Sequence, residues 1–161
     1  MNTYVLSVLV ENHPSVLSKI SGLFARRGYN IHSLTVGPTE DPSLSRMTIV
    51  VKGDEYMLEQ IHKQLNKLID VIKIIILDPE KSVYRELALI KVTAADPVTK
   101  SSITEAVNVF RYKIIDMDIK SMTIEVTGDS NKVEAFISLM RPYGIKKIAK
   151  TGLTALERGN L

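Results

Sequence analysis

An internal repeat constrains the fold of this chain more than any other feature. The segment RMTIVVKGD, which begins at Arg46, returns as SMTIEVTGD from Ser121, an offset of 75 positions. Nearer the start of each copy the offset is 83, because Pro14 matches Pro97. The second copy is therefore about eight residues shorter, close to the length of the segment GPTEDPSL, which indicates a loop deletion. Such a chain is expected to fold as two related domains.

Helical and strand-like patterns alternate within each copy. Runs that alternate apolar and polar residues predict strands, and apolar residues at spacings of three and four predict helices. The first helix is expected after Pro14, and its apolar face consists of Val16, Leu17, Ile20, Leu23 and Phe24. A second helix is expected after Asp54, and its inward residues are Met57, Leu58, Ile61, Leu65 and Leu68. The copy of this second helix begins at Asp129 and buries Val133, Phe136 and Met140.

Each copy therefore has the order strand, helix, strand, strand, helix, strand. This order is typical of a split β-α-β unit, in which two helices cover one face of a four-stranded antiparallel sheet. The fold class is accordingly α+β, with two ferredoxin-like (βαββαβ) domains in tandem. We place the first domain at residues 1–78 and the second at residues 79–161.

Two of the expected strands are apolar on both sides. A strand with one exposed face alternates strictly, whereas VIKIIIL (Val71–Leu77) and TIVV (Thr48–Val51) carry apolar residues at consecutive positions. The burial of even four aliphatic side chains contributes on the order of 6 to 12 kcal/mol. We expect the second sheet face to be covered by the other half of the chain or by a second copy, as in a homodimer.

Composition excludes several classes of protein. The chain has no cysteine, so that disulfides, thiolate metal sites and cysteine nucleophiles are absent. The longest wholly apolar run, Ile74–Leu77, is far shorter than the roughly 20 residues that span a bilayer. The first residues also lack the cationic start of a secretory signal. We expect a cytoplasmic protein that does not interact with membranes.

A nucleic-acid partner is not expected either. The formal net charge is only +3, and the one local basic cluster lies within residues 141–150. Aromatic residues make up 6% of the chain, and the strand that begins at Arg46 lacks the aromatic side chains on which an RNA-recognition sheet stacks bases.

The sequence contains no recognisable catalytic or metal-binding motif. His13, His32 and His62 show no spacing typical of a metal site. Asp116 and Asp118 alternate along one expected strand, but such carboxylate pairs are common on exposed edges. Phosphate loops, nucleophile elbows and dinucleotide fingerprints are also missing. We therefore predict no catalytic residue, no metal site and no cofactor on this chain.

The junction between the first strand and the first helix is the remaining candidate site. The start of a helix presents unpaired N–H groups and a partial positive charge, which together attract a carboxylate. Asn12 lies beside this start, and Asn30 opens the second strand, at an edge that both strand regions can reach. Two amides and a helix terminus could hold an amino acid, although Asn12 could equally cap the helix and Asn30 could be a turn residue.

These residues lie within a segment that closely resembles a known family. The segment ENHPSVLSKISGLFARRGYNIHSLTVGPTEDPSLSRMTIVVKGD (Glu11–Asp54) is similar to the small, regulatory subunits of acetohydroxyacid synthase (acetolactate synthase), whose N-terminal half is an ACT domain. The segment KTGLTALERG (Lys150–Gly159) also resembles this family. The resemblance covers essentially the whole chain and is weaker in the middle.

The resemblance implies a subunit without its own active site that activates a separate catalytic large subunit. That partner would carry thiamine diphosphate, FAD and magnesium, and this chain would make it sensitive to feedback by valine, with leucine and isoleucine as open alternatives. In this family the ACT domains pair side by side in a homodimer, and the effector lies at the joint. Carried onto this chain, the effector site comprises Asn12, Pro14, Ser15, Val16 and Leu17, and across the interface Asn30 and Ile31.

One position departs from the family pattern. The family usually has glycine where this chain has Ser15, and a glycine at such a turn lets a ligand approach the backbone closely. A serine adds a side chain and a hydroxyl, which could crowd the effector or give it a new hydrogen bond. We therefore expect altered feedback, weakened where the serine crowds the effector, with preserved activation. The alternative to a regulatory subunit is a free-standing ACT-type amino-acid sensor that acts on transcription or on another enzyme. This alternative needs an output module, and the sequence has no apparent DNA-reading helix.

Overall fold

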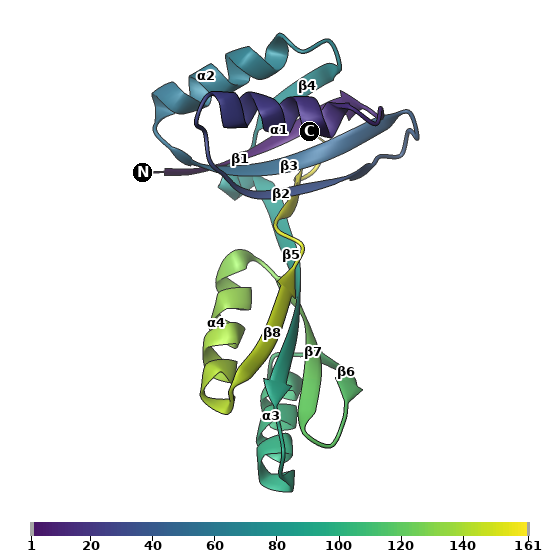
Figure 1. Ribbon diagram of the computed structural model, residues 1–161, viewed down its shortest axis with the longest axis vertical. Coiled ribbons are helices and arrows are strands. Elements are labelled where there is room, and N and C mark those ends of the chain that lie inside the picture. The colour runs from purple at the N-terminus through teal and green to yellow at the C-terminus, as the bar shows by residue number, and fades with distance from the viewer. Residues whose placement is uncertain (1, 161) are drawn as a thin grey trace. The chain divides into compact units, whose positions relative to one another are not determined.

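A computed structural model of the chain describes residues 2–160, which form two compact units. The first unit joins the described residues up to Val83 with those from Leu153 onward, and the second unit comprises Tyr84–Gly152. Each unit consists of a sheet with two helices (Figure 1).

The first unit has the predicted element order. Its elements are β1 (Asn2–Glu11), α1 (Val16–Arg26), β2 (Ile31–Pro38), β3 (Leu44–Gly53), α2 (Glu55–Asn66), β4 (Val71–Ile76), a 3-10 turn (Pro79–Lys81) and the late strand β9 (Thr154–Glu157). The strands β1 to β4 form an antiparallel sheet in the order β2-β3-β1-β4. The strand β9 pairs with β5, whose first residues belong to this unit.

The second unit repeats this topology. Its elements are β5 (Ser82–Thr93), α3 (Pro97–Val109), β6 (Lys113–Met117), β7 (Ser121–Gly128), α4 (Ser130–Met140), a 3-10 turn (Arg141–Tyr143) and β8 (Ile145–Lys150). The strand order β6-β7-β5-β8 is antiparallel and corresponds position by position to that of the first sheet. The predicted α+β fold of two βαββαβ units, related by the sequence repeat, is confirmed.

Each unit has its own apolar core between its helices and one face of its sheet. In the first core Ile20 and Phe24 of α1 are almost fully buried against Leu6 and Ile49 of the sheet. In the second core the predicted residues Val133, Phe136 and Met140 are buried, together with the neighbouring Ile137. In both units an aspartate caps the second helix. Asp54 accepts a hydrogen bond from the amide of Met57, and Asp129 accepts one from the amide of Lys132.

Leu17 does not belong to this core, contrary to the sequence prediction. Its side chain is 42% exposed, whereas Val16, Ile20, Leu23 and Phe24 are buried. The helical spacing places Leu17 at the margin of the apolar stripe, and it lies in the first turn of the helix. Leu17 is therefore available at the surface beside the start of α1.

The sheet face of the first unit that lies opposite the helices is also covered. Ser7, Thr48 and Val50 lie on this face, since they alternate with the core residues of β1 and β3, and all three are buried. The hydroxyl of Thr35, which shares this face, donates a hydrogen bond of 2.8 Å to the carbonyl of Leu153. Part of the cover is therefore a strand from the C-terminal end of the same chain.

The compact units differ from the expected domains in two respects. They divide at Val83 rather than at residue 78, because β5 begins in the first unit. The residues from Leu153 onward, expected in the second domain, group with the first because Leu153 and Ala155 are buried there. Of the second apolar strand, Ile72 and Ile76 are 51% and 44% exposed. Within residues 2–160, no helix has the length and apolar character that crossing a membrane requires.

Candidate functional site

The start of α1 lacks the side-chain cap that the equivalent helix of the second unit has. Asp96 caps α3, because its carboxylate accepts hydrogen bonds from the backbone N–H and the hydroxyl of Thr99 at 2.8 and 2.9 Å. These bonds lower the pKa of Asp96, with the backbone bond as the larger cause. In α1 the capping position is Ser15, and its side chain makes no capping hydrogen bond. The N–H groups at the start of α1 therefore lack the side-chain acceptor that those at the start of α3 have.

Two backbone N–H groups in the first turn of α1 are free to bind an acceptor. Val16 donates to the carbonyl of His13 and Lys19 donates to that of Ser15, but Leu17 and Ser18 donate to no acceptor within residues 2–160. No acidic side chain lies in this turn. Free N–H groups and the positive end of the helix dipole favour an anion at this position.

Asn12 is held beside this turn but does not cap the helix. Its backbone N–H donates to the carbonyl of Ser43 at 2.8 Å, and its Nδ2 donates to the carbonyl of Pro42 at 3.1 Å. The loop that provides these carbonyls is ordered by Asp41, which accepts from the hydroxyl and the backbone N–H of Ser43. Both bonds lower the pKa of Asp41. The Oδ1 of Asn12 accepts no hydrogen bond from the described chain, so it can receive one from a ligand.

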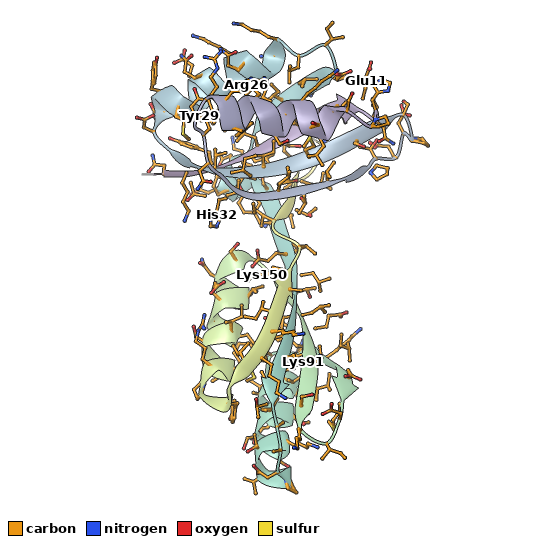
Figure 2. The ribbon with its side chains drawn as sticks, in the orientation of Figure 1. Glu11, Arg26, Tyr29, His32, Lys91 and Lys150 are labelled. Carbon is orange, nitrogen blue, oxygen red and sulfur yellow. The ribbon has the colours of Figure 1, made fainter. Side chains whose placement is uncertain are left out.

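Asn30 and Ile31 lie at the opposite end of the same sheet. Ile31 and Tyr4 are both level with Val51, whereas Glu11, which precedes Asn12, is level with Leu44. Glu11 lies seven positions after Tyr4, which corresponds to roughly 23 Å along the strand at about 3.3 Å per residue. Figure 2 shows the same separation, with Glu11 at one end of the first unit and Tyr29 and His32 at the other. The expectation that both asparagines reach a shared edge within one chain is therefore wrong.

The position of Asn30 is fixed by the turn between α1 and β2. Gly28 ends the helix with a φ of +71°, a left-handed conformation that glycine adopts without strain. The ring of Tyr29 then packs edge-on against Phe24, with centroids 6.3 Å apart. Asn30 itself is exposed and precedes the first residue of β2, so its side chain is accessible.

An ionic cluster that the sequence analysis did not identify lies beside Asn12. The Nε2 of His13 is 2.8 Å from Glu11 Oε2, and the Nζ of Lys19 is 2.8 Å from Asp70 Oδ2. One ligand-type atom each from Glu11, His13 and Asp70 lie within 4.8 Å of one another. Asp70 comes from the turn before β4, and no sequence motif links it to the other residues. Since the groups are paired with one another and with Lys19, they anchor the segment between β1 and α1.

The other residues considered in the sequence analysis are not brought together. His32 is exposed on β2, and His62 contacts Asn66 one turn further along α2. Asp116 ends up on β6, but Asp118 lies in the following turn and not on the same strand. The carboxylate of Asp118 accepts from the backbone N–H of Lys120 and from both the hydroxyl and the N–H of Ser121, and these bonds lower its pKa. Asp118 therefore orders a turn.

The second unit lacks the two asparagines. At the offset of 83, position 12 corresponds to Ala95 and position 30 corresponds to Lys113. With Asp96 capping α3, the second unit has neither the free helix start nor the amide side chains. The candidate site therefore belongs to the first unit alone.

Comparison with known proteins identifies relatives over nearly the whole chain. Residues 6–73 match the family model described as the AHAS small subunit-like ACT domain, and residues 85–159 match the model for the small subunit of acetolactate synthase. A probable acetolactate synthase small subunit from Methanothermobacter thermautotrophicus is 50% identical over 159 residues, which are 99% of this chain and 95% of that protein. The acetolactate synthase small subunit of Mycolicibacterium smegmatis is 55% identical over 98% of this chain and 92% of its own length.

A solved structure shares the fold over the full length. The crystal structure of the acetolactate synthase small subunit from Thermotoga maritima superimposes with a TM-score of 0.92 at 47% sequence identity, and the match covers 100% of both chains.

Proposed function

The chain belongs to the family of acetolactate synthase small subunits, which are regulatory rather than catalytic, and from this premise we propose that it controls a separate catalytic subunit. In this proposal it associates with the large subunit of acetolactate synthase, raises the activity of that subunit and makes it sensitive to feedback by valine. Thiamine diphosphate, FAD and magnesium belong to the large subunit. The observation that carries the proposal is identity of 50% or more to small subunits over at least 98% of this chain.

We place the effector site at the start of α1, in a dimer of this chain. The unpaired backbone N–H groups of Leu17 and Ser18 support this position, as does the free Oδ1 of Asn12. The N–H groups would take the effector's carboxylate, and Asn12 Oδ1 would accept from its ammonium group. Pro14, Ser15 and the exposed side chain of Leu17 would surround the rest of the ligand.

Asn30 and Ile31 join this site only from a second chain. The strand β2 is at the edge of its sheet, so its outer side can pair with another strand. If two β2 edges pair antiparallel about a two-fold axis, the start of one strand lies beside the end of the other. That end, at Pro38, adjoins the loop whose carbonyls hold Asn12. This arrangement supports a site in which Asn12 of one protomer acts with Asn30 of its partner.

Feedback then requires that the effector binds one arrangement of the pair more tightly than another. A ligand at the seam, the interface between the paired β2 edges, contacts both protomers. Its affinity therefore depends on how the protomers are arranged. A coupling free energy of about 1 to 3 kcal/mol, typical of allosteric proteins, changes the activity of a partner about 5- to 150-fold. An effector that binds all arrangements equally does not change the activity of the partner. At the seam, the effector can bind one arrangement of the protomers more tightly than another.

Reconstitution tests the proposal directly. The catalytic subunit is assayed for acetolactate formation alone, with this chain, and with this chain plus valine, leucine or isoleucine. We expect stimulation by the chain and inhibition of the stimulated rate by at least one of the three amino acids. Absence of stimulation at saturating concentrations of this chain would refute the role as a regulatory subunit. Stimulation without inhibition by any of the three would refute only the effector site.

A further inference from the structure

The first unit contains a cavity of about 420 Å³ between the end of β2 and the C-terminal strand β9. Its polar lining includes Thr35, Glu40, Arg46, Thr48 and Thr154, with Pro38 and Leu156 among its apolar residues. Thr35, Arg46 and Thr48 belong to the sheet face opposite the helices, because Met47 between them is part of the helix-side core. The cavity is therefore on the other side of the sheet from the start of α1.

Arg46 provides an unpaired positive charge in this cavity. It is half-buried, and its one hydrogen bond runs from Nη1 to Ser7 Oγ over 3.2 Å. No ion pair links it to a carboxylate of residues 2–160, although Glu40 also lines the cavity. A guanidinium group offers five N–H donors, and leaving a half-buried charge without a counter-charge costs free energy. This side chain is therefore able to bind an anion.

The surrounding groups define what kind of anion fits. The hydroxyl of Thr48 makes no hydrogen bond within the described chain, although the residue is only 3% exposed, so it is available to a ligand. Pro38, Ala155 and Leu156 provide apolar surface. Because the acidic residue Glu40 also lines this space, a ligand with a single negative charge is favoured over one with two. A volume of about 420 Å³ lies within the range of small-molecule sites, about 300 to 1,000 Å³.

We propose that this cavity binds a small aliphatic monocarboxylate. Its carboxylate accepts hydrogen bonds from Arg46 and Thr48, and its aliphatic part packs against Pro38 and Leu156. Such a ligand contacts both β2 and β9 and thereby holds the C-terminal strand on the sheet. This site is separate from the effector site at Asn12, and it requires neither an ammonium group on the ligand nor a second protomer.

Titration of the ¹⁵N-labelled full chain with 3-methylbutanoate, followed by amide chemical shifts, tests the proposal. We expect saturable shifts at Thr35–Glu40 and Thr154–Leu156. The neutral analogue 3-methylbutanamide, which has the same aliphatic part, should produce no saturable shifts there. Arg46→Gln should raise the dissociation constant about tenfold or more, because a hydrogen bond to a charged group is lost. Arg26→Gln, on the exposed end of α1, should leave the dissociation constant unchanged.

Three results would overturn the proposal. These are equal shifts with acid and amide, shifts confined to the start of α1, and unchanged affinity in Arg46→Gln. If Arg46→Gln does not fold, two milder variants decide the matter. Arg46→Lys keeps the charge and should retain measurable affinity, whereas Thr48→Val keeps the shape and should weaken binding severalfold. Unaltered binding by Thr48→Val together with complete loss of saturable shifts in Arg46→Lys would contradict the assigned contacts.

Discussion

Gly28 and Arg111 occupy the same turn in the two units, 83 positions apart, and both have a left-handed backbone. Their φ angles are +71° and +60°. Each residue follows the first helix of its unit and directly precedes a tyrosine, Tyr29 or Tyr112, that lies just before the next strand. The backbone conformation of this turn is thus the same in both units, although only the first has the residue type that adopts it without strain.

Arg111→Gly is therefore expected to stabilise the protein. A non-glycine residue in the left-handed region costs about 1 kcal/mol, part of which the greater freedom of glycine in the unfolded chain offsets, so we expect a net gain of about 0.5 kcal/mol. Urea denaturation followed by circular dichroism measures this gain. Arg111 is exposed and lies outside the core, so that no packing is lost.

Two matched variants control for this interpretation. Gly28→Ala should destabilise by about 1 kcal/mol, since an added Cβ meets no atom within 4 Å and only the backbone conformation is penalised. Arg27→Gly, one residue earlier at a φ of −90°, should destabilise by up to about 1 kcal/mol rather than stabilise. A gain in stability from Arg27→Gly would show that the effect is unrelated to φ.

The seam between protomers makes a distinctive prediction for mixed dimers. If each effector site uses Asn12 of one chain and Asn30 of the other, Asn12→Ala and Asn30→Ala should each abolish tight valine binding. A heterodimer of the two variants has one intact site and one doubly damaged site. After equilibration of a 1:1 mixture, calorimetric titration should therefore recover about a quarter of the wild-type sites at wild-type affinity. No recovery after verified subunit exchange would show that Asn12 of one chain and Asn30 of the other do not form a shared site.

The repeat and the helix faces of this protein could be predicted from sequence because they depend on local periodicity. Val133, Phe136 and Met140 are core residues as their spacing indicates. The cover over Thr48 and the contact of Thr35 with Leu153 could not be predicted, because residues 118 positions apart are brought together by tertiary structure alone. The separation of Asn12 from Asn30 follows from strand register, and register depends on which strands pair. The irregular start of α1, two residues after Pro14, likewise has no local signal.

Ser15→Gly should strengthen binding of the effector. Ser15 is exposed at the start of α1, and its side chain makes no capping hydrogen bond, so its removal sacrifices no contact there. A glycine lets the ligand approach the backbone more closely. We expect the dissociation constant for valine, measured by calorimetry, to be about threefold to tenfold lower, which corresponds to a gain of about 0.6 to 1.4 kcal/mol in binding free energy. Ser101→Gly, at an exposed position of α3 in the second unit, is the control and should leave the dissociation constant unchanged. Equal affinities for wild type and Ser15→Gly would show that Ser15 does not crowd the site.

Acid is expected to lower the stability of the second unit by protonating two carboxylates, one that caps α3 and one that orders the turn before β7. Hydrogen bonds from backbone N–H groups lower the pKa of Asp96 and of Asp118 below the ordinary value of 3.8. A carboxyl group whose pKa is lowered by folding stabilises the protein fully above the unfolded pKa, and this contribution is lost as the pH falls through the folded pKa. Stability should therefore decline from about pH 4 downward.

Urea denaturation at a series of pH values checks this decline, and carboxyl ¹³C titration locates the two pKa values. In Asp118→Asn the amide oxygen can still accept hydrogen bonds but does not titrate, so the decline should be shallower. A decline as steep as in the wild type would mean that Asp118 does not contribute to it.

The C-terminal strand should loosen when its bond to β2 is removed. In Thr35→Val the carbonyl of Leu153 loses its donor at 2.8 Å, and Thr154 loses the hydroxyl to which it donates at 3.4 Å. We expect a loss of about 0.5 to 1.5 kcal/mol, typical of one partly buried hydrogen bond. Amide hydrogen exchange should accelerate at residues 153–157 while the core of α3 and α4 stays protected. Thr127→Val, at an exposed position of β7, is the matched control. Unchanged exchange at residues 153–157 would show that burial of Leu153 and Ala155 holds the strand without this hydrogen bond.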